Sequence, residues 1–485
     1  MNTIDSRHVD GYWLTPARVA VIVSLGLTVA IASVFPIVIL LLVAVLSLWV
    51  AFRFPRAATT VGAITAVLVR PSLDLFGAVS LPGGNPASLF GGLMLVWGAT
   101  VGLARLYRGL SIWPNRRIAI PLGLLLLLHA TLFIFGLAVS RTGQLSVEAR
   151  ELARFGSTFA AGMLAIWWQN DSRDRGWQPA VLVIVVASVF PIAVGVVQAL
   201  TGTGNHEDSN LNRVYGSFTH PLSYGPYLLP LVVLGVAGVA RIRGPGRLLA
   251  MAYAATAATL VFLTYNRTTM VLLFVALAIY AILELAQVRL VDVVRFGGGI
   301  AALVIMGWLV FGSQISERFS GISITSGAIQ EALTAGSQNS FQWRIVNWAI
   351  LIQLALSHPI VGHGLGMTTV LNPLIQASSG IPFNAHDDYV RFFFEGGLIG
   401  LTLYSAFVAA LAMWLLRARS ALHAADRSVS YAIIASLAAL YVFSAGTTEM
   451  SLQTGVLCQT YLLIAILVGA ESRREVADKH AVRVE

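Results

Sequence analysis

Residues 384–416 read NAHDDYVRFFFEGGLIGLTLYSAFVAALAMWLL. The part from 396 to 416 has no charged residue, and its length matches the roughly 20 apolar residues that a helix needs to cross a bilayer. The part before it carries ionisable side chains on both sides of an aromatic run, from His386 to Glu395. This stretch therefore predicts a polar segment at a membrane face that leads directly into a membrane-spanning helix.

Long apolar segments recur along the whole chain. Of its 485 residues, 57% are hydrophobic and only 11% are charged, whereas soluble domains have about 25% charged residues. A soluble fold could not cover so much apolar surface. We therefore predict an all-α polytopic membrane protein with about 12–14 transmembrane helices. About fourteen apolar segments suggest this number: they lie near 18–33, 36–52, 58–69, 87–104, 118–140, 155–169, 179–201, 222–240, 248–264, 268–286, 296–312, 396–416, 429–446 and 452–470.

The arginines predict how the chain is oriented. When the N-terminus is placed in the cytoplasm and the spans alternate, most of the 31 basic residues fall in cytoplasmic segments. This agrees with the tendency of cytoplasmic loops to be rich in arginine and lysine. Both termini are then cytoplasmic, and the net charge of +9 reflects topology and not a nucleic-acid partner. The segment from Met1 to Ala17 is polar and the apolar block after it is long, which predicts no cleavable signal peptide.

This orientation places the longest segment between spans on the outer face. We expect eleven spans in 1–312, an outer helical loop in 313–394, further spans in 395–470 and a cytoplasmic tail in 471–485. Within the loop, FQWRIVNWAILIQLALSHP at 341–359 has helical periodicity and predicts a helix at the membrane surface that ends at Pro359. Its apolar face would hold Phe341, Ile345, Trp348 and Ile352, and its polar face Ser340, Arg344 and Asn347.

The candidate chemical groups all fall on the predicted outer face. Arg213 and His220 precede one span, Arg267 lies in a very short turn between two spans, and Arg344 lies on the loop helix. The fourth group is His386 with its neighbours Asp387, Asp388, Tyr389 and Glu395. Arginine grips phosphate oxygens in a two-pronged hydrogen-bonded fork, and histidine accepts a proton near neutral pH. Beside an apolar body, this set suggests a lipid-linked phosphate substrate that reacts at the outer surface.

Each candidate also has a plainer interpretation. A single arginine at a membrane face is more often an interface anchor than a ligand-binding residue, and the neighbouring Asp387 and Asp388 are a weak signal for a metal. Zinc-ligand spacing, a nucleophile elbow, a phosphate-binding loop and a dinucleotide fingerprint are absent from the sequence. We therefore expect neither a metal nor a cofactor.

Four stretches resemble one known family. They are RVYGSFTHP at 213–221, YNRTTM at 265–270, WRIVNWAILIQLALSHPIVGHGLG at 343–366 and AHDDYVRFFFEGGLIGL at 385–401. The chain resembles the superfamily of O-antigen ligases and O-antigen polymerases, which are bacterial membrane glycosyltransferases. The resemblance covers roughly the second half of the chain, and the last two stretches are its most specific part.

The resemblance implies a glycosyltransferase-C-like fold and a metal-independent, inverting enzyme in the bacterial cytoplasmic membrane. Its donor would be a glycan on an undecaprenyl-diphosphate carrier, and its acceptor a hydroxyl of a glycan, lipid or protein. Carried over by motif, Arg213, Arg267 and, with less specificity, Arg344 would bind the diphosphate, and His386 would be the base. The family often has asparagine after this histidine, where the present chain has Asp387. Phe392 to Phe394 would then anchor the segment at the interface, and the glycines at 396, 397 and 400 would allow close helix packing.

Other classes stay open on the sequence. A ligase and a polymerase differ in acceptor, and the residues do not separate them. A transporter of a polysaccharide precursor or a small anion is the main alternative, although the charges gather on one side and not at the bilayer midplane. A scaffolding membrane protein would have no use for the outer arginines and histidine.

Overall fold

The computed structural model describes residues 45–46, 49–76, 85–113, 116–139, 145–172, 176–205, 212–285, 340–374, 384–420, 427–442, 451 and 453–484. Within these ranges the chain is helical and has no β-strand, apart from one isolated bridge between Asn205 and Arg213. The all-α prediction is confirmed. The predicted spans near 18–33 and 296–312, most of the span near 36–52 and the first part of the outer loop, 313–339, lie outside the described residues.

Nine helices in the described ranges are long and apolar enough to cross a membrane, which confirms a polytopic membrane protein. They are α3 (Pro55–Leu73, followed by the 3₁₀ turn η1, Asp74–Phe76), α4 (Pro86–Tyr107), α5 (Arg116–Val139), α7 (Gln178–Thr201), α8 (Pro221–Arg241), α9 (Pro245–Leu263), α10 (Arg267–Leu285), α15 (Asp388–Ser420) and α17 (Thr454–Val484). Helix α6 (Leu145–Asp171) is equally long, but its first turns carry several charged residues.

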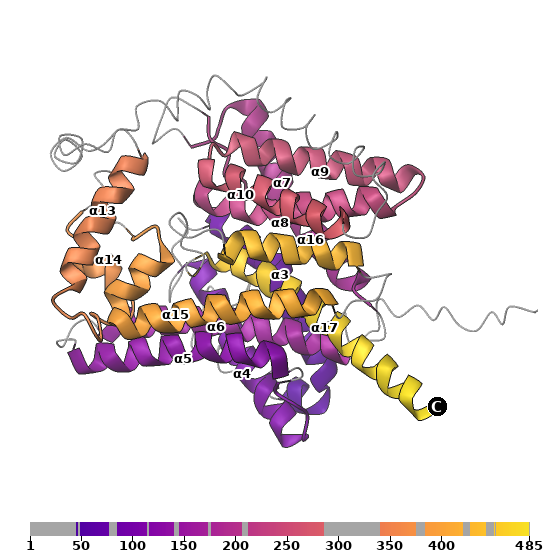
Figure 1. Ribbon diagram of the computed structural model, residues 1–485, viewed down its shortest axis with the longest axis horizontal. Coiled ribbons are helices and arrows are strands. Elements are labelled where there is room, and N and C mark those ends of the chain that lie inside the picture. The colour runs from indigo at the N-terminus through magenta and orange to yellow at the C-terminus, as the bar shows by residue number, and fades with distance from the viewer. Residues whose placement is uncertain are drawn as a thin grey trace, which may run out of the picture.

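Three shorter helices complete the described part of the fold. Helix α16 (Arg427–Leu437) continues as a π-helical turn, η4 (Ala438–Val442), and α13 (Ser340–Ala355) and α14 (Thr368–Leu371) lie in the predicted outer loop. Figure 1 shows α5, α6 and α15 running alongside one another, with α13 and α14 at one end of the bundle. The C-terminus lies at the opposite end. We call the first end the α13 end.

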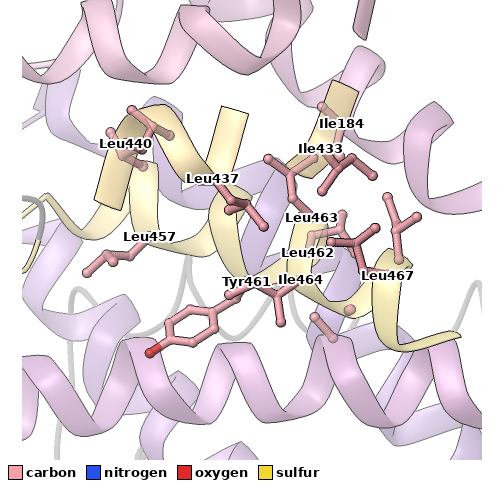
Figure 2. Packing of buried hydrophobic residues seen from close by; sticks show 14 of the residues in the cluster. Ile184, Ile433, Leu437, Leu440, Leu457, Tyr461, Leu462, Leu463, Ile464 and Leu467 are labelled. Carbon is pink, nitrogen blue, oxygen red and sulfur yellow. The ribbon is translucent and has the colours of Figure 1, made fainter. Parts of the chain in front are cut away.

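Helix α17 lies at the centre of the bundle. Every residue from Thr454 to Ser472 is buried, and the helix packs against α3, α6, α7, α8 and α16. Figure 2 shows Leu462, Leu463 and Leu467 of α17 in one hydrophobic cluster with Ile433 of α16 and Ile184 of α7. The helix continues to Val484, so the predicted tail at 471–485 is mostly helical.

Helix α13 is present in the outer loop, as its periodicity predicts. It ends at Ala355, however, before Pro359, and the burial of its residues does not follow their polarity. Ile352 is 41% exposed, whereas the polar Asn347 is fully buried. The reason is that Asn347 forms hydrogen bonds with neighbouring loops, so the helix buries a face that contains a satisfied polar group.

The polar segment before α15 is shorter than predicted, because the helix begins at Asp388 and not near residue 395. The early start carries the aromatic run into the protein. Phe392 and Phe394 have no exposed surface, so the prediction that they anchor the chain at the membrane interface is wrong. Phe392 instead packs against Tyr404, and Phe394 stacks on His363.

Helix α15 is interrupted at Gly397, where φ is 58° and ψ is −150°. At the break the carbonyls of Phe394 and Glu395 accept hydrogen bonds from the backbone N–H groups of His363 (3.1 Å) and Gly364 (2.8 Å). The N–H of Leu398 donates to the Pro359 carbonyl at 2.8 Å. The turn at 359–366 thus satisfies backbone groups that the interrupted helix leaves unpaired.

Candidate functional site

Two loops that carry predicted arginines are joined by hydrogen bonds at the α13 end. The Arg213 Nε donates to the Thr264 carbonyl at 3.2 Å, and the Val214 N–H donates to the Leu263 carbonyl at 3.0 Å. Arg267 begins α10 just after this turn and is partly buried. The structure therefore brings the Arg213 side chain and the Val214 backbone against the turn that leads to Arg267, although 54 sequence positions separate the two arginines.

The loop with Arg213 is fixed by the end of α7. The buried Gln198 accepts hydrogen bonds from the N–H groups of Tyr215 (3.0 Å) and Gly216 (2.9 Å) and donates to the Gly216 carbonyl at 3.0 Å. The bridge to Asn205 holds the other side of Arg213, whose side chain is 6% exposed. A guanidinium held on so rigid a backbone keeps a defined direction, which suits recognition of a fixed anion.

His386 lies between α13 and the start of α15. Trp348 donates its indole N–H to the Ala385 carbonyl at 2.8 Å, and the Asn347 amide donates to the Asn384 carbonyl at 2.9 Å. The Trp343 ring and the imidazole are nearly perpendicular, with ring centroids 5.6 Å apart. The predicted loop helix is thus a direct neighbour of the predicted histidine.

Arg344 and His220 lie close enough to His386 to act on it electrostatically. Burial lowers the pKa of His386 far below its ordinary value, the positive charge of Arg344 lowers it further, and the proximity of His220 acts in the same direction. His220 is the N-cap residue of α8, where its Nδ1 accepts the Leu222 N–H at 3.1 Å. Three predicted site residues from separate elements therefore come together, and the imidazole of His386 is neutral at physiological pH.

The carboxylates near His386 have different surroundings. Asp387 caps the start of α15: its Oδ1 accepts the N–H groups of Tyr389 (2.6 Å) and Val390 (3.0 Å). Asp388 is buried and accepts hydrogen bonds from the Tyr404 hydroxyl (3.3 Å), the Ser451 N–H (3.2 Å) and the Ser451 hydroxyl. Asp388 therefore faces the interior of the bundle, and Asp387 is engaged by the backbone of its own helix.

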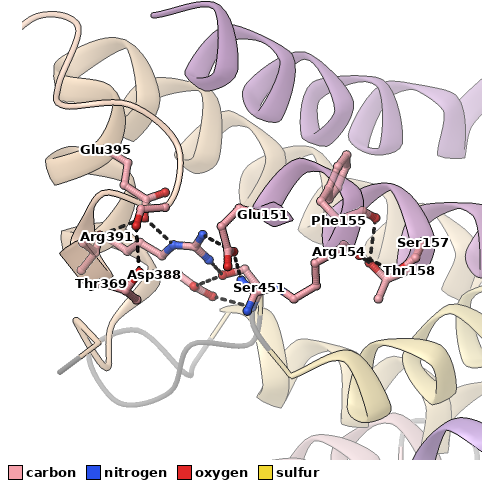
Figure 3. A network of polar contacts seen from close by, with 12 residues as sticks. Glu151, Arg154, Phe155, Ser157, Thr158, Thr369, Asp388, Arg391, Glu395 and Ser451 are labelled. Atoms are coloured by element: carbon pink, nitrogen blue, oxygen red, sulfur yellow. Dashed lines mark hydrogen bonds and ion pairs between the residues drawn. The ribbon is translucent and has the colours of Figure 1, made fainter. Parts of the chain in front are cut away.

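Glu395 belongs to a buried network that the sequence did not reveal. Its Oε1 accepts hydrogen bonds from the Thr368 hydroxyl (2.9 Å) and from the Arg391 Nε (3.1 Å). Arg391 is 3% exposed, donates to the Ser451 hydroxyl at 2.8 Å and lies 3.7 Å from Glu151 of α6. Figure 3 shows Arg391 between Glu395 and Glu151, with Asp388 and Ser451 alongside.

A sequence signal for this network exists in α6. Glu151 and Arg154 form an ion pair three residues apart, at the start of a segment that is otherwise apolar. Charged residues at the entrance of a spanning helix pair with other buried groups, because an unpaired charge there is costly. The network fixes the first turns of α15 to α6 and to Ser451, and thereby sets the position from which the His386 loop begins.

No three His, Cys, Asp or Glu side chains gather as metal ligands within the part of the chain that the structure describes. The groups that do gather are a neutral imidazole, a partly buried arginine and a second histidine. Arg213 is hydrogen-bonded to the turn that leads to Arg267 at the start of α10. Chemically, this set could bind a diphosphate and accept a proton from a hydroxyl.

Comparison with known proteins agrees with three of the four sequence stretches, those at 265–270, 343–366 and 385–401. No curated protein matches the chain. A family model described as O-antigen ligase matches residues 252–405, a range that includes Arg267, Arg344 and His386, while Arg213 and His220 precede it. Over residues 252–405 this membrane protein is thus similar to O-antigen ligases.

Proposed function

We propose that the protein transfers a glycan from an undecaprenyl-diphosphate carrier to an acceptor hydroxyl at the outer face of the bacterial cytoplasmic membrane. The observation that supports this most is the neutral His386 beside Arg344, both inside the residues that match the ligase family, with His220 near them. A base next to cationic groups suits a reaction in which a hydroxyl loses a proton while a diphosphate leaves.

In the proposed reaction the acceptor oxygen attacks the anomeric carbon of the donor glycan. The bond between that carbon and the diphosphate oxygen breaks, and undecaprenyl diphosphate leaves with the electron pair. His386 takes the proton of the acceptor hydroxyl as the new glycosidic bond forms. A single displacement of this kind inverts the configuration at the anomeric carbon.

Arg213, Arg267 and Arg344 are the proposed diphosphate-binding residues. Their charges would stabilise the negative charge that develops on the leaving diphosphate, a task that a divalent metal performs in other enzymes. The rigid loop of Arg213 and its hydrogen bond to the turn before Arg267 support a joint role for these two arginines. Within this proposal Asp387, Asp388, Tyr389 and Glu395 support the site through the start of α15.

Reconstitution provides the direct test. Purified protein in liposomes would be given an undecaprenyl-diphosphate oligosaccharide as the donor. The acceptor would be a second molecule of the same oligosaccharide, a lipid-linked sugar or a peptide. Release of undecaprenyl diphosphate with a longer glycan product supports a polymerase, and release with transfer to the other acceptors supports a ligase. Activity should persist in a chelator. Uptake of labelled glycan without release of the lipid diphosphate would instead favour a transporter.

The Arg267→Lys substitution separates a binding residue from an interface anchor. Lysine keeps the charge but lacks the planar fork, so we expect most of the transfer activity to be lost if Arg267 binds the diphosphate. Initial rates in the liposome assay measure this loss. Arg243→Lys is the matched control, because Arg243 is exposed on the loop between α8 and α9 and should tolerate lysine. Full activity in Arg267→Lys would remove this residue from the site.

The pH profile tests the state of the base. Because its pKa in the folded protein lies well below 6.5, His386 should stay neutral, and kcat/KM should stay level as pH falls from 7.5 to about 5.5. The unfolded chain binds the proton at a higher pH than the fold does, so stability falls as pH drops below about 6.5. Rates must therefore be recorded where the protein remains folded. A half-loss of kcat/KM near pH 6.5 would contradict the lowered pKa.

A further inference from the structure

One face of α13 is directed at the chain just before His386. Arg344, Asn347 and Trp348 are spaced three and four residues apart, so they share that face. Asn347 and Trp348 donate hydrogen bonds to two consecutive backbone carbonyls, those of the two residues that precede His386. The contacts are made to the main chain, so they fix the course of the loop and not one side chain.

His386 has an unusual backbone conformation. Its φ is 54°, in the left-handed region that non-glycine residues rarely adopt. Such a conformation persists only where the surrounding structure imposes it. Asp387 fixes the chain on the following side through its N-cap hydrogen bonds. The preceding side is fixed by the two hydrogen bonds from α13, so the left-handed turn is held at both ends.

Asn347 is itself held in one orientation. It is fully buried, and its side-chain oxygen accepts a hydrogen bond of 2.8 Å from the Asn372 amide, so its own amide faces the Asn384 carbonyl. Trp348 has a single polar atom, the indole N–H that meets the Ala385 carbonyl. Each contact can therefore be removed by a substitution that preserves most of the side chain's shape.

We propose that Asn347 and Trp348 are positioning residues, which impose the left-handed backbone at His386 and thereby orient its imidazole. The effect on catalysis rests on the proposed role of His386 as the base, whereas the effect on the conformation of His386 does not. Since Arg344 lies on the same face of α13, the helix that would contact the donor diphosphate also sets the direction of the base.

Chemical modification tests the conformation without any glycan transfer. In Trp348→Phe, we expect diethyl pyrocarbonate to modify His386 about fivefold faster than in the wild type, because losing one hydrogen bond frees the loop. Mass spectrometry of the purified protein measures the rate, with the exposed His358 as an internal standard. The control is Trp167→Phe, which removes an indole N–H that donates to the Ile112 carbonyl at 2.9 Å elsewhere in the fold. An unchanged His386 rate in Trp348→Phe, or an equal increase in the control, overturns the proposal.

Asn347→Asp is the second variant. It keeps an acceptor for Asn372 but sets a carboxylate oxygen against the Asn384 carbonyl, and we expect the same increase in His386 modification. This variant keeps the proposal testable if Trp348→Phe folds poorly. If neither variant changes the His386 rate while both fold, α13 does not impose the conformation.

Turnover gives the functional half of the test. A misdirected base should lower kcat about tenfold in Trp348→Phe with little change in the donor KM. The same substitution in a His386→Ala background should cause no further loss, because the residue acts through His386. Additive losses would overturn the positioning role. If His386→Ala keeps full activity, the assignment of the base fails, and the modification rates still decide the conformational claim.

Discussion

Replacement of His386 by alanine is expected to lower the turnover of glycan transfer by at least about a hundredfold, because a positioned base contributes about 10²–10⁴-fold to such reactions. Donor binding should change little, since the proposed contacts to the diphosphate come from arginines on other elements. The measurement is the rate of undecaprenyl diphosphate release, together with retention of a labelled lipid-linked donor by the purified protein.

Two other histidines serve as controls for this prediction. His358 is exposed after α13, and His358→Ala should transfer glycan at the wild-type rate. His220 lies near enough to influence His386, so His220→Ala should have a smaller effect than His386→Ala. If the His220 substitution is the more damaging, the base belongs to the loop that precedes α8. Weaker donor binding at unchanged turnover would assign His386 to substrate binding.

Replacement of Gly397 by alanine is expected to destabilise the protein by about 3 kcal/mol or more, through backbone strain and overpacking together. The residue has a positive φ, and an added Cβ would lie 2.4 Å from the carbonyl carbon of Ile360 and 2.7 Å from the Pro359 oxygen. These are backbone atoms, so they cannot swing aside as the end of a side chain does. The turn at 359–366 would have to move away from the break in α15.

Thermal unfolding of the purified protein in detergent measures this effect. Gly92→Ala is the matched control, because Gly92 lies inside α4 and an added Cβ meets nothing within 4 Å. Alanine there should raise stability slightly, since glycine is a poor helix former. An unchanged melting temperature in Gly397→Ala would mean that the break in α15 is not needed for the fold.

The spans were predictable from the sequence because a membrane imposes one requirement along each segment. A helix that crosses the bilayer must be long and apolar, whatever its neighbours are. The helices from α7 to α10 accordingly fall where the hydropathy places them. The proximity of His220 and Arg344 to His386, and of Arg213 to the turn before Arg267, is compatible with the prediction that alternating spans bring these segments to one side.

The partners of individual polar residues were not predictable in this way. The sequence predicts that Arg391 and Glu395 belong to a polar segment at the surface, yet both are buried and form an ion pair with each other. The burial of Asn347 could not be predicted, because the hydropathy of a residue contains no information about hydrogen-bond partners in other loops. For the same reason Phe392 was wrongly predicted at the membrane interface: its burial depends on the residue at which α15 begins. Such contacts depend on tertiary structure, which periodicity along one helix does not contain.

The complete burial of α17 has a consequence for mutational tolerance. On α7 the buried residues form one stripe, and Leu182, Val186 and Phe190 on its other side are exposed. Apolar side chains there can exchange for one another with little cost, because lipid adapts to their shape. On α17 every position from Thr454 to Ser472 is surrounded by protein, so each is limited in volume as well as in polarity. A library of apolar substitutions should therefore leave the outer side of α7 largely unselected and retain few variants along α17.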